Sequence, residues 1–264
     1  MRPKFYIVGG DPRMEYISAV LHDSGFSVRS GCLYDHSDES CIVLPPAAEK
    51  GLVDAAGAFA KKDEIYFGGI LPESFMSTIS ERGAHAYDYF KREECAILNA
   101  VPTAEGALQL ALEELPVTIN FLPVLILGYG HVGKACASLF SQVGAKVTVA
   151  VRKATDFAWL EAFRLGSADI RKLVCHVGGY GLIINTVPHR LLTREVLERV
   201  KRDCLIIDLA SKPGGLDMEA ASELGLRVIW ALSLPGKVAP VTAGGIIAKT
   251  IRNIVSEIME SPSG

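Results

Sequence analysis

Three glycines, Gly128, Gly130 and Gly133, have the G-x-G-x-x-G spacing that binds a dinucleotide phosphate. They follow the apolar run Val-Leu-Ile-Leu and precede a helix-like stretch at 134–142. In this motif the first glycine permits a tight turn, the second lets the backbone approach a pyrophosphate, and the third allows close packing of helix on strand. The N–H groups of the new helix then face the anion. The motif therefore predicts a dinucleotide-binding site.

Two other residues of the same loop are cofactor candidates. His131 and Val132 lie between the second and third glycines, where the His131 ring could reach the pyrophosphate. His131 could equally be an exposed spacer. The alternative for the whole loop is a Rossmann-like domain that has lost its ligand.

The end of the next predicted strand indicates which dinucleotide is bound. NAD sites usually place an acidic residue there for the ribose 2′-hydroxyl, whereas a nearby Arg accommodates a 2′-phosphate. This strand ends in Arg152 and Lys153, and the first acidic residue is Asp156. We therefore expect NADP, with NAD as the alternative; two solvated basic residues would be the simpler explanation.

Further candidates follow from the rule that ligands bind outside the carboxyl ends of parallel strands. On the dinucleotide side these are Thr186, Val187 and Pro188. Three cations that follow predicted strands, Arg13, Lys212 and Lys237, would suit an anionic substrate such as a carboxylate. The expected substrate-binding residues are Arg13, Thr103, Lys212, Lys237 and Thr242. The alternative is that lysines in glycine-rich loops are only solvated.

Acid–base chemistry has two candidates, Glu105 and Lys212. Glu105 could exchange a proton if its site raised its pKa, or it could anchor a helix through first-turn N–H groups. His189 follows a strand end, but a surface histidine is the commoner outcome. Asp208 ends an apolar strand, and we interpret it as orienting the loop that follows.

Composition excludes several classes. The chain has 264 residues, 49% hydrophobic and 22% charged, with a net charge of -3. A substantial core is expected, whereas a nucleic-acid or membrane-surface binder is not. No signal peptide and no stretch of about 18 apolar residues is seen. The six cysteines are scattered, so reduced core thiols of a cytoplasmic protein are expected, without a disulfide frame or a metal site.

Alternating apolar and helical patterns predict an α/β protein of two Rossmann-like domains with parallel sheets, joined by crossing helices and with a cleft between them. Strands are expected at 5–8, 26–32, 41–44, 65–67, 86–90, 124–127, 146–151, 182–187, 205–209 and 227–231. Helices are expected at 14–24, 52–59, 72–83, 103–115, 134–142, 155–165, 193–200, 217–225 and after 244.

The expected domains are a substrate-side domain, 1–115 plus 240–264, and a NAD(P)-binding domain, 116–239. Their first connection is an amphipathic helix capped by Thr103, after Pro102. The second is the long final helix, which should return to the first domain.

Five segments together resemble the family of dipicolinate synthase A subunits, which spore-forming bacteria make. They are Gly-Gly-Asp-Pro-Arg at 9–13, Val-Pro-Thr-Ala-Glu-Gly at 101–106, the glycine-rich segment at 126–133, Asp-Leu-Ala-Ser-Lys-Pro-Gly-Gly at 208–215 and Leu-Pro-Gly-Lys-Val-Ala-Pro-Val-Thr-Ala-Gly at 234–244. The last two are the most specific. The family commonly has Arg at the positions of His131 and Lys212, an apolar residue at Lys237 and Lys at Val241.

The resemblance implies NAD(P)-dependent oxidation of a dihydrodipicolinate-type ring to pyridine-2,6-dicarboxylate. It also implies that the partner is a flavoprotein-like B subunit of the same synthase, and it implies a place in sporulation, in the mother-cell cytoplasm. The substrate would be a small dicarboxylate, which agrees with the expected cations. Whether the chain forms a homo-oligomer is left open.

Two other functions remain. One is a different two-domain dehydrogenase, of the alanine, 2-hydroxyacid or methylenetetrahydrofolate type; His189 alone does not supply the Arg/Glu/His set of the 2-hydroxyacid enzymes. The other is a non-catalytic NADP-binding sensor or scaffold, since no acid–base pair is evident. Turnover by the purified chain would separate the enzymes from the scaffold.

Overall fold

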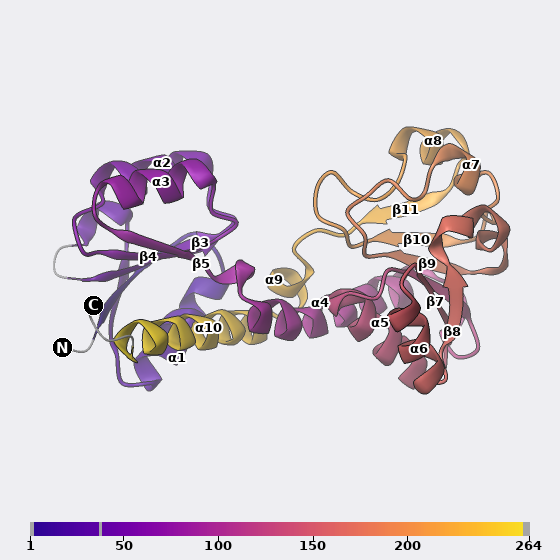
Figure 1. The fold of residues 1–264 in the computed structure, drawn as a ribbon, viewed down its shortest axis with the longest axis horizontal. Coiled ribbons are helices and arrows are strands. Elements are labelled where there is room, and N and C mark those ends of the chain that lie inside the picture. The colour runs from indigo at the N-terminus through magenta and orange to yellow at the C-terminus, as the bar shows by residue number, and fades with distance from the viewer. Residues whose placement is uncertain (1–2, 37–38, 261–264) are drawn as a thin grey trace. The chain divides into compact units, whose positions relative to one another are not determined.

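The computed structural model describes residues 3–36 and 39–260, and the chain divides into two compact units (Figure 1). Unit 1 comprises Met1–Asn99 and Pro235–Gly264, and unit 2 comprises Ala100–Leu234. The two boundaries fall inside helices α4 (Glu93–Glu114) and α9 (Leu234–Val238). Each unit contains one parallel sheet with helices on its faces, so the predicted α/β class with two Rossmann-like sheets is confirmed.

Unit 1 has a five-stranded parallel sheet in the order β2-β1-β3-β4-β5. Its strands are β1 (Lys4–Val8), β2 (Ser27–Gly31), β3 (Cys41–Pro46), β4 (Ile65–Gly69) and β5 (His85–Asp88). Its helices are α1 (Arg13–Asp23), α2 (Lys50–Phe59), α3 (Glu73–Glu81) and α10 (Pro240–Glu260), with short 3-10 turns η1 (Leu33–Asp35) and η2 (Tyr89–Lys91).

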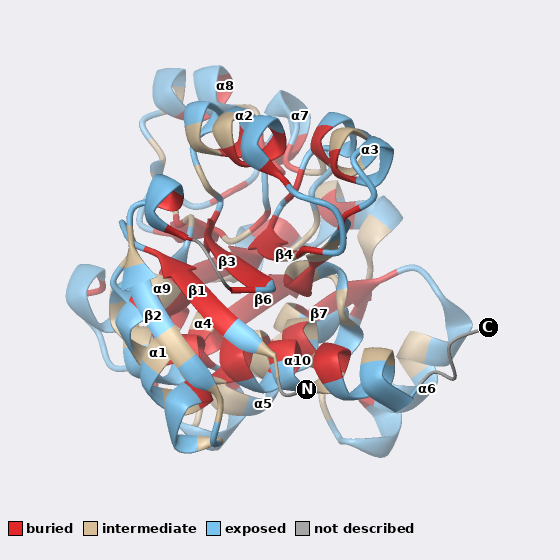
Figure 2. Ribbon diagram, turned by 90° about the vertical axis from the view of Figure 1, so that its left-hand side faces the viewer, coloured by how far each residue is buried: buried red, intermediate tan, exposed pale blue. Residues whose placement is uncertain are grey.

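The two faces of this sheet are covered by different helix pairs. Side chains alternate along β1, so Phe5 and Ile7 join α1 and α10 on one face, while Tyr6 and Val8 join α2 and α3 on the other. Strands β3 and β4 are buried almost throughout (Figure 2). The final helix α10 therefore completes the first unit's core, through residues such as Ile251.

Unit 2 has a six-stranded parallel sheet in the order β11-β10-β9-β6-β7-β8. The strands are β6 (Pro123–Leu127), β7 (Lys146–Val151), β8 (Gly166–Asp169), β9 (Leu182–Asn185), β10 (Leu205–Asp208) and β11 (Arg227–Trp230). The helices are α5 (His131–Gln142), α6 (Ala154–Ala162), α7 (Arg194–Leu197) and α8 (Met218–Glu223), with 3-10 turns η3 (Ile170–Cys175) and η4 (Val177–Gly179).

This strand order is that of the doubly wound dinucleotide-binding fold, with its switch point between β6 and β9. One face of the sheet packs on α7, α8 and the η3 segment, with Leu125, Ile183 and Ile206 in the core. Helices α5 and α6 pack against β6, β7 and β8. The carboxyl ends of β6 and β9 are therefore the place where this fold binds a ligand.

Helix α4 is longer than the sequence predicts. The expected helix begins after Pro102 with Thr103 as its cap, but α4 begins at Glu93 and continues through Pro102. Both the cap at Thr103 and a first-turn anchoring role for Glu105 are therefore wrong. Proline lacks the N–H donor and its ring crowds the carbonyl of residue i−4, and a helix with a buried stripe, here including Ala100, tolerates both effects.

Two smaller expectations also need correction. Among the described helices, α4 is long and apolar enough by length and composition to cross a membrane, so the expectation of no such stretch is too strong. Core helices of soluble proteins can have the same length and composition. All six cysteines are free, but Cys32 and Cys175 are exposed and are not core thiols. Burial raises the pKa of Cys136 to about 12, which makes that thiol unreactive.

Candidate functional site

The glycine-rich turn connects β6 to α5 in the conformation that its motif requires. Gly128 has φ +93°, the left-handed region that glycine adopts without strain. A Cβ there would lie 2.7 Å from Cγ2 of Val187. The backbone N–H of Gly128 donates to the carbonyl of Ala150 at 3.0 Å, which places the turn beside the end of β7.

Gly133 and Thr186 hold this turn against the end of β9. A Cβ at Gly133 would collide with the carbonyl oxygen of Gly128, so the close helix–strand approach needs glycine. The hydroxyl of Thr186 donates to the carbonyl of Leu127 at 2.7 Å. Thr186 and Val187, both predicted cofactor contacts, therefore pack against the glycine-rich turn.

Gly130 differs from the other two glycines because it faces open space. No atom lies within 4 Å of the position that its Cβ would take. It is the N-cap residue of α5, and the first-turn N–H groups of a helix lack carbonyl partners within the helix. His131 is exposed and Val132 is half-buried on this first turn. The turn therefore offers room and donors for a pyrophosphate.

The basic pair lies at the carboxyl end of β7, the strand next to β6. Arg152 and Lys153 are both exposed between β7 and α6. Burial and the Asp156 carboxylate raise the pKa of Tyr129. Tyr129 and Trp159 of α6 line one cavity, so α6 lies close to the glycine-rich turn. The two cations thus follow the strand end at which a ribose 2′-group is bound in this fold.

A buried polar network fixes the ends of β9 and β10. Asp208 accepts hydrogen bonds from Asn185 Nδ2 at 2.7 Å, Ala210 N at 3.0 Å and Gly215 N at 2.8 Å. The Asn185 amide also bonds to both backbone groups of Val187. The loop-orienting role expected for Asp208 is confirmed, and Asn185 is its partner, which the sequence pattern does not reveal.

The expected catalytic side chains are not joined to this network. Lys212 lies exposed on the loop that Asp208 holds, and Glu105 is exposed in the interior of α4. Within 3–36 and 39–260, neither side chain makes a hydrogen bond or an ion pair. Thr103 is half-buried on α4, while Pro188 and His189 are exposed after β9.

In unit 1, Arg13 is a nearly buried cation that already has a partner. Its Nε and Nη2 donate to the two carboxylate oxygens of Asp11 at 2.8 and 2.7 Å. These bonds hold the pKa of Asp11 below its ordinary value. Asp11 takes two of the five guanidinium N–H donors, so Arg13 keeps donors for an anion but with its charge largely compensated.

Gly236 gives Arg13 its space within unit 1. A Cβ at Gly236 would lie 3.0 Å from Cζ of Arg13, so the segment before α10 packs directly on the guanidinium. Lys237, the next residue, is exposed in α9, and Thr242 is exposed in the first turn of α10. The structure thus places the backbone of Gly236 against the Arg13 guanidinium, and Lys237 is the next residue.

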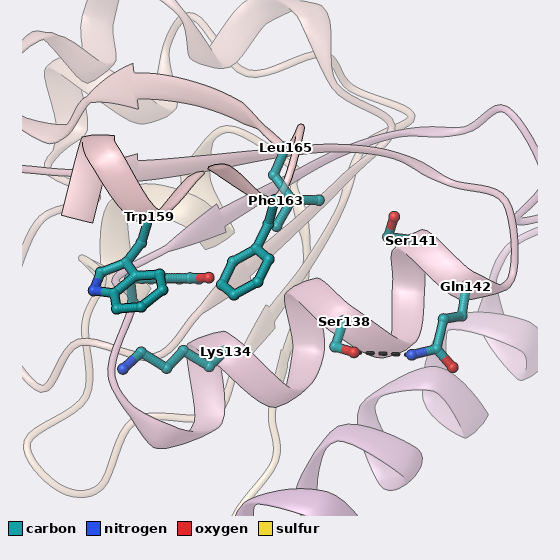
Figure 3. A pocket seen from close by; sticks show the side chains of 8 residues that line it. Lys134, Ser138, Ser141, Gln142, Trp159, Phe163 and Leu165 are labelled. Carbon is teal, nitrogen blue, oxygen red and sulfur yellow. Dashed lines mark hydrogen bonds between the residues drawn. The ribbon is translucent and has the colours of Figure 1, made fainter. Parts of the chain in front are cut away.

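A groove that the sequence pattern did not reveal runs between α5 and α6 in unit 2 (Figure 3). It has a volume of about 580 Å³ and begins at Tyr129 and Lys134, beside the glycine-rich turn. Trp159 and Phe163 stack with ring centroids 5.5 Å apart along its side. Trp159 is exposed on α6 and Phe163 is exposed just after its end, and this i, i+4 spacing is the signal that could have indicated the groove.

A sheet in the doubly wound order with an intact glycine-rich turn at its switch point defines a dehydrogenase-type dinucleotide-binding protein. Over the described residues, no group of three His, Cys, Asp or Glu side chains is placed to hold a metal ion.

No protein-family model matches the chain. The A subunit of dipicolinate synthase from Bacillus subtilis (strain 168) is 29% identical to it, over 97% of this chain and 96% of its own length. The crystal structure of the dipicolinate synthase A subunit from Bacillus halodurans has a TM-score of 0.87 and 25% identity, covering 98% of both chains. The sequence resemblance to dipicolinate synthase A subunits is therefore confirmed over nearly the whole chain.

The fold extends to more distant proteins. The transhydrogenase from Sinorhizobium meliloti has a TM-score of 0.78 at 14% identity, covering 97% of this chain and 95% of its own. At that identity the likeness shows the fold alone.

Proposed function

We propose that this chain is the dehydrogenase subunit of a dipicolinate synthase, oxidising a dihydrodipicolinate-type ring to pyridine-2,6-dicarboxylate. The single observation that carries the proposal is the full-length similarity to the A subunit of dipicolinate synthase. The intact glycine-rich turn supports it, because Gly130 leaves open the space that a pyrophosphate needs. The same proposal includes cytoplasmic activity in the sporulating mother cell and, as partner, a flavoprotein-like B subunit.

The residues present fit a dinucleotide. Gly128, Gly130 and Gly133, with the first turn of α5, would hold the pyrophosphate. Arg152 and Lys153 would hold a 2′-phosphate, which favours NADP over NAD. His131 and Val132 on the phosphate side, and the strand-end residues Thr186, Val187 and Pro188, complete the proposed cofactor contacts. Bound NADP would supply a hydride acceptor.

The chain's own task is to bind the substrate and keep its geometry. The ring loses a hydride and a proton and becomes aromatic, so orientation and exclusion of water are the main requirements. Arg13 has three N–H donors left for a carboxylate, and Lys237 and Thr242 follow in the same unit. From unit 2, Thr103 and Lys212 are the proposed substrate contacts. Glu105 is the proposed proton acceptor, and Lys212 is the second proposed catalytic residue, acting as a cation toward the substrate carboxylate.

The test is an absorbance assay for NADPH formation. The purified chain is mixed with NADP and the fresh product of dihydrodipicolinate synthase, with NAD in parallel, and a second series includes the B subunit. NADPH and pyridine-2,6-dicarboxylate in equal amounts are the expected result. Tight NADPH binding without turnover, in both series, would contradict the proposal and favour a sensor or scaffold.

A further inference from the structure

Ile70 has a backbone conformation that its side chain disfavours. It follows β4 with φ +57°, in the left-handed region. Among the described non-glycine residues with positive φ, which are Ala47, Asp63, Ile70, Phe121, Arg164 and Ser233, it alone is β-branched. A β-branched residue in this region is a genuine outlier, whereas glycine or asparagine would adopt it with little strain.

The turn after β4 accounts for the positive φ at position 70, but it does not account for an isoleucine there. Leu71 is buried and folds back over Gly68, where a Cβ would lie 2.5 Å from its Cδ2 atom. The buried carboxylate of Asp88 accepts from the N–H of Leu71 at 3.0 Å and from that of Phe90 at 2.9 Å. These contacts accompany the left-handed conformation at position 70. They do not require isoleucine, because its side chain is 68% exposed.

Ile70 follows the carboxyl end of β4, on the side of the sheet where Arg13 follows the carboxyl end of β1. Strands β1 and β4 flank β3, and because the three strands are parallel their carboxyl ends lie on this same side. Tyr89 connects the two places. A Cβ at Gly69 would lie 2.9 Å from the Tyr89 ring, and Tyr89 packs in the same core cluster as Met14, the residue after Arg13. A strained, exposed apolar residue and a cation with unused N–H donors therefore both follow strand ends on the same side of this sheet.

We infer that Ile70 is a specificity-determining residue, whose side chain contacts the face of a carboxylate-bearing ring held by Arg13. The inference rests on the proposed function for the identity of that ring. A single exposed apolar residue is ordinary on a protein surface. Strain and exposure at one position are both unfavourable in the free protein, and contact with a ligand would offset them.

The experiment measures binding of pyridine-2,6-dicarboxylate by titration calorimetry, together with the melting temperature. The variants are Ile70→Gly and Ile70→Asn, which suit the left-handed backbone, and Ile70→Val, which keeps a β-branched apolar side chain. Phe121→Gly is the matched control, because Phe121 has φ +62°, is also 68% exposed and belongs to unit 2.

For Ile70→Gly and Ile70→Asn we expect about a tenfold weaker affinity with an unchanged or raised melting temperature. Ile70→Val should stay within about threefold of the wild type, since it loses one methylene. Phe121→Gly should bind as the wild type does. A merely structural role for Ile70 would lower the melting temperature instead.

Two results would overturn the inference: affinity within about twofold of the wild type in Ile70→Gly, or a loss of affinity that follows a fall in melting temperature. Absence of binding by the wild type would overturn it as well. Binding by the wild type without any NADPH formation would sink only the proposed reaction, so the two failures can be told apart.

Discussion

The side-chain amide of Asn185 lies 2.7 Å from Oδ1 of Asp208, and both residues are fully buried at the ends of adjacent strands. This pair connects the loop after β9, through Val187, to the loop after β10, through Ala210 and Gly215. Thr186 extends the connection to β6. The loops around the switch point are therefore held in place before any ligand binds.

Replacing Asp208 should destabilise unit 2. Asp208→Ala removes one of the two acceptors of the Asn185 amide and the acceptor of two buried backbone N–H groups, which should lower the free energy of unfolding by about 2–4 kcal/mol. Thermal unfolding followed by circular dichroism measures the change. Asp203→Ala, an exposed carboxylate of the same unit, should have little effect. An equal loss in both variants would contradict the role of the buried network.

The glycines of the turn should separate folding from cofactor binding. Gly133→Ala collides with the Gly128 carbonyl and should cost about 1–3 kcal/mol of stability. Gly130→Ala meets no protein atom within 4 Å, so its melting temperature should not change. Its added methyl should weaken NADPH binding by about tenfold or more, measured by nucleotide fluorescence. Unchanged NADPH affinity in Gly130→Ala would place the pyrophosphate elsewhere.

Arg152 should decide the choice of dinucleotide. Arg152→Ala removes a charged donor to the 2′-phosphate and should weaken NADPH binding roughly 10- to 100-fold, while NADH binding stays the same. Fluorescence titration at two salt concentrations measures both. Arg202→Ala, which removes an exposed cation from the same unit, is the control. Equal losses for NADPH and NADH in Arg152→Ala would count against 2′-phosphate recognition.

The substrate cations should affect substrate use more than cofactor binding. Arg13→Ala and Lys212→Ala each remove a charged donor to a carboxylate, so each should raise the KM of the dicarboxylate about tenfold. NADPH affinity should stay near that of the wild type. Steady-state kinetics and fluorescence titration supply the two values. If either variant abolished NADPH binding, the assignment of that residue to the substrate would be wrong.

The Asp11–Arg13 pair should contribute a pH-dependent part of the stability. Because Arg13 lowers the pKa of Asp11 from 3.8, the contribution is complete above about pH 4 and is lost as pH falls through the lowered value. Arg13→Gln should therefore melt below the wild type at pH 7, and the gap should narrow toward pH 2. Melting temperatures across this range test it; a constant gap would mean that the ion pair is not its cause.

Local patterns in the sequence predict much of this architecture. The spacing of Gly128, Gly130 and Gly133 after an apolar strand predicts the turn, because each glycine answers a requirement of nearby backbone. Alternating strands and helices predict two parallel sheets for the same reason. Strand β8 escapes prediction because its short sequence, Gly-Ser-Ala-Asp, has little apolar pattern. The predicted start of α4 is wrong because Pro102 is ordinarily a sign of a helix's first turn.

The tertiary structure alone decided which residues contact each other when they are distant in sequence or when the sequence allows several partners. Nothing local shows that Asn185 meets Asp208, that Asp11 rather than solvent faces Arg13, or that Trp159 and Phe163 border a groove beside Lys134. Sequence periodicity reports which face of an element is buried. Which polar groups meet depends on how sheet order and loop conformation bring strand ends together, and so the partners of each candidate residue emerged only from the fold.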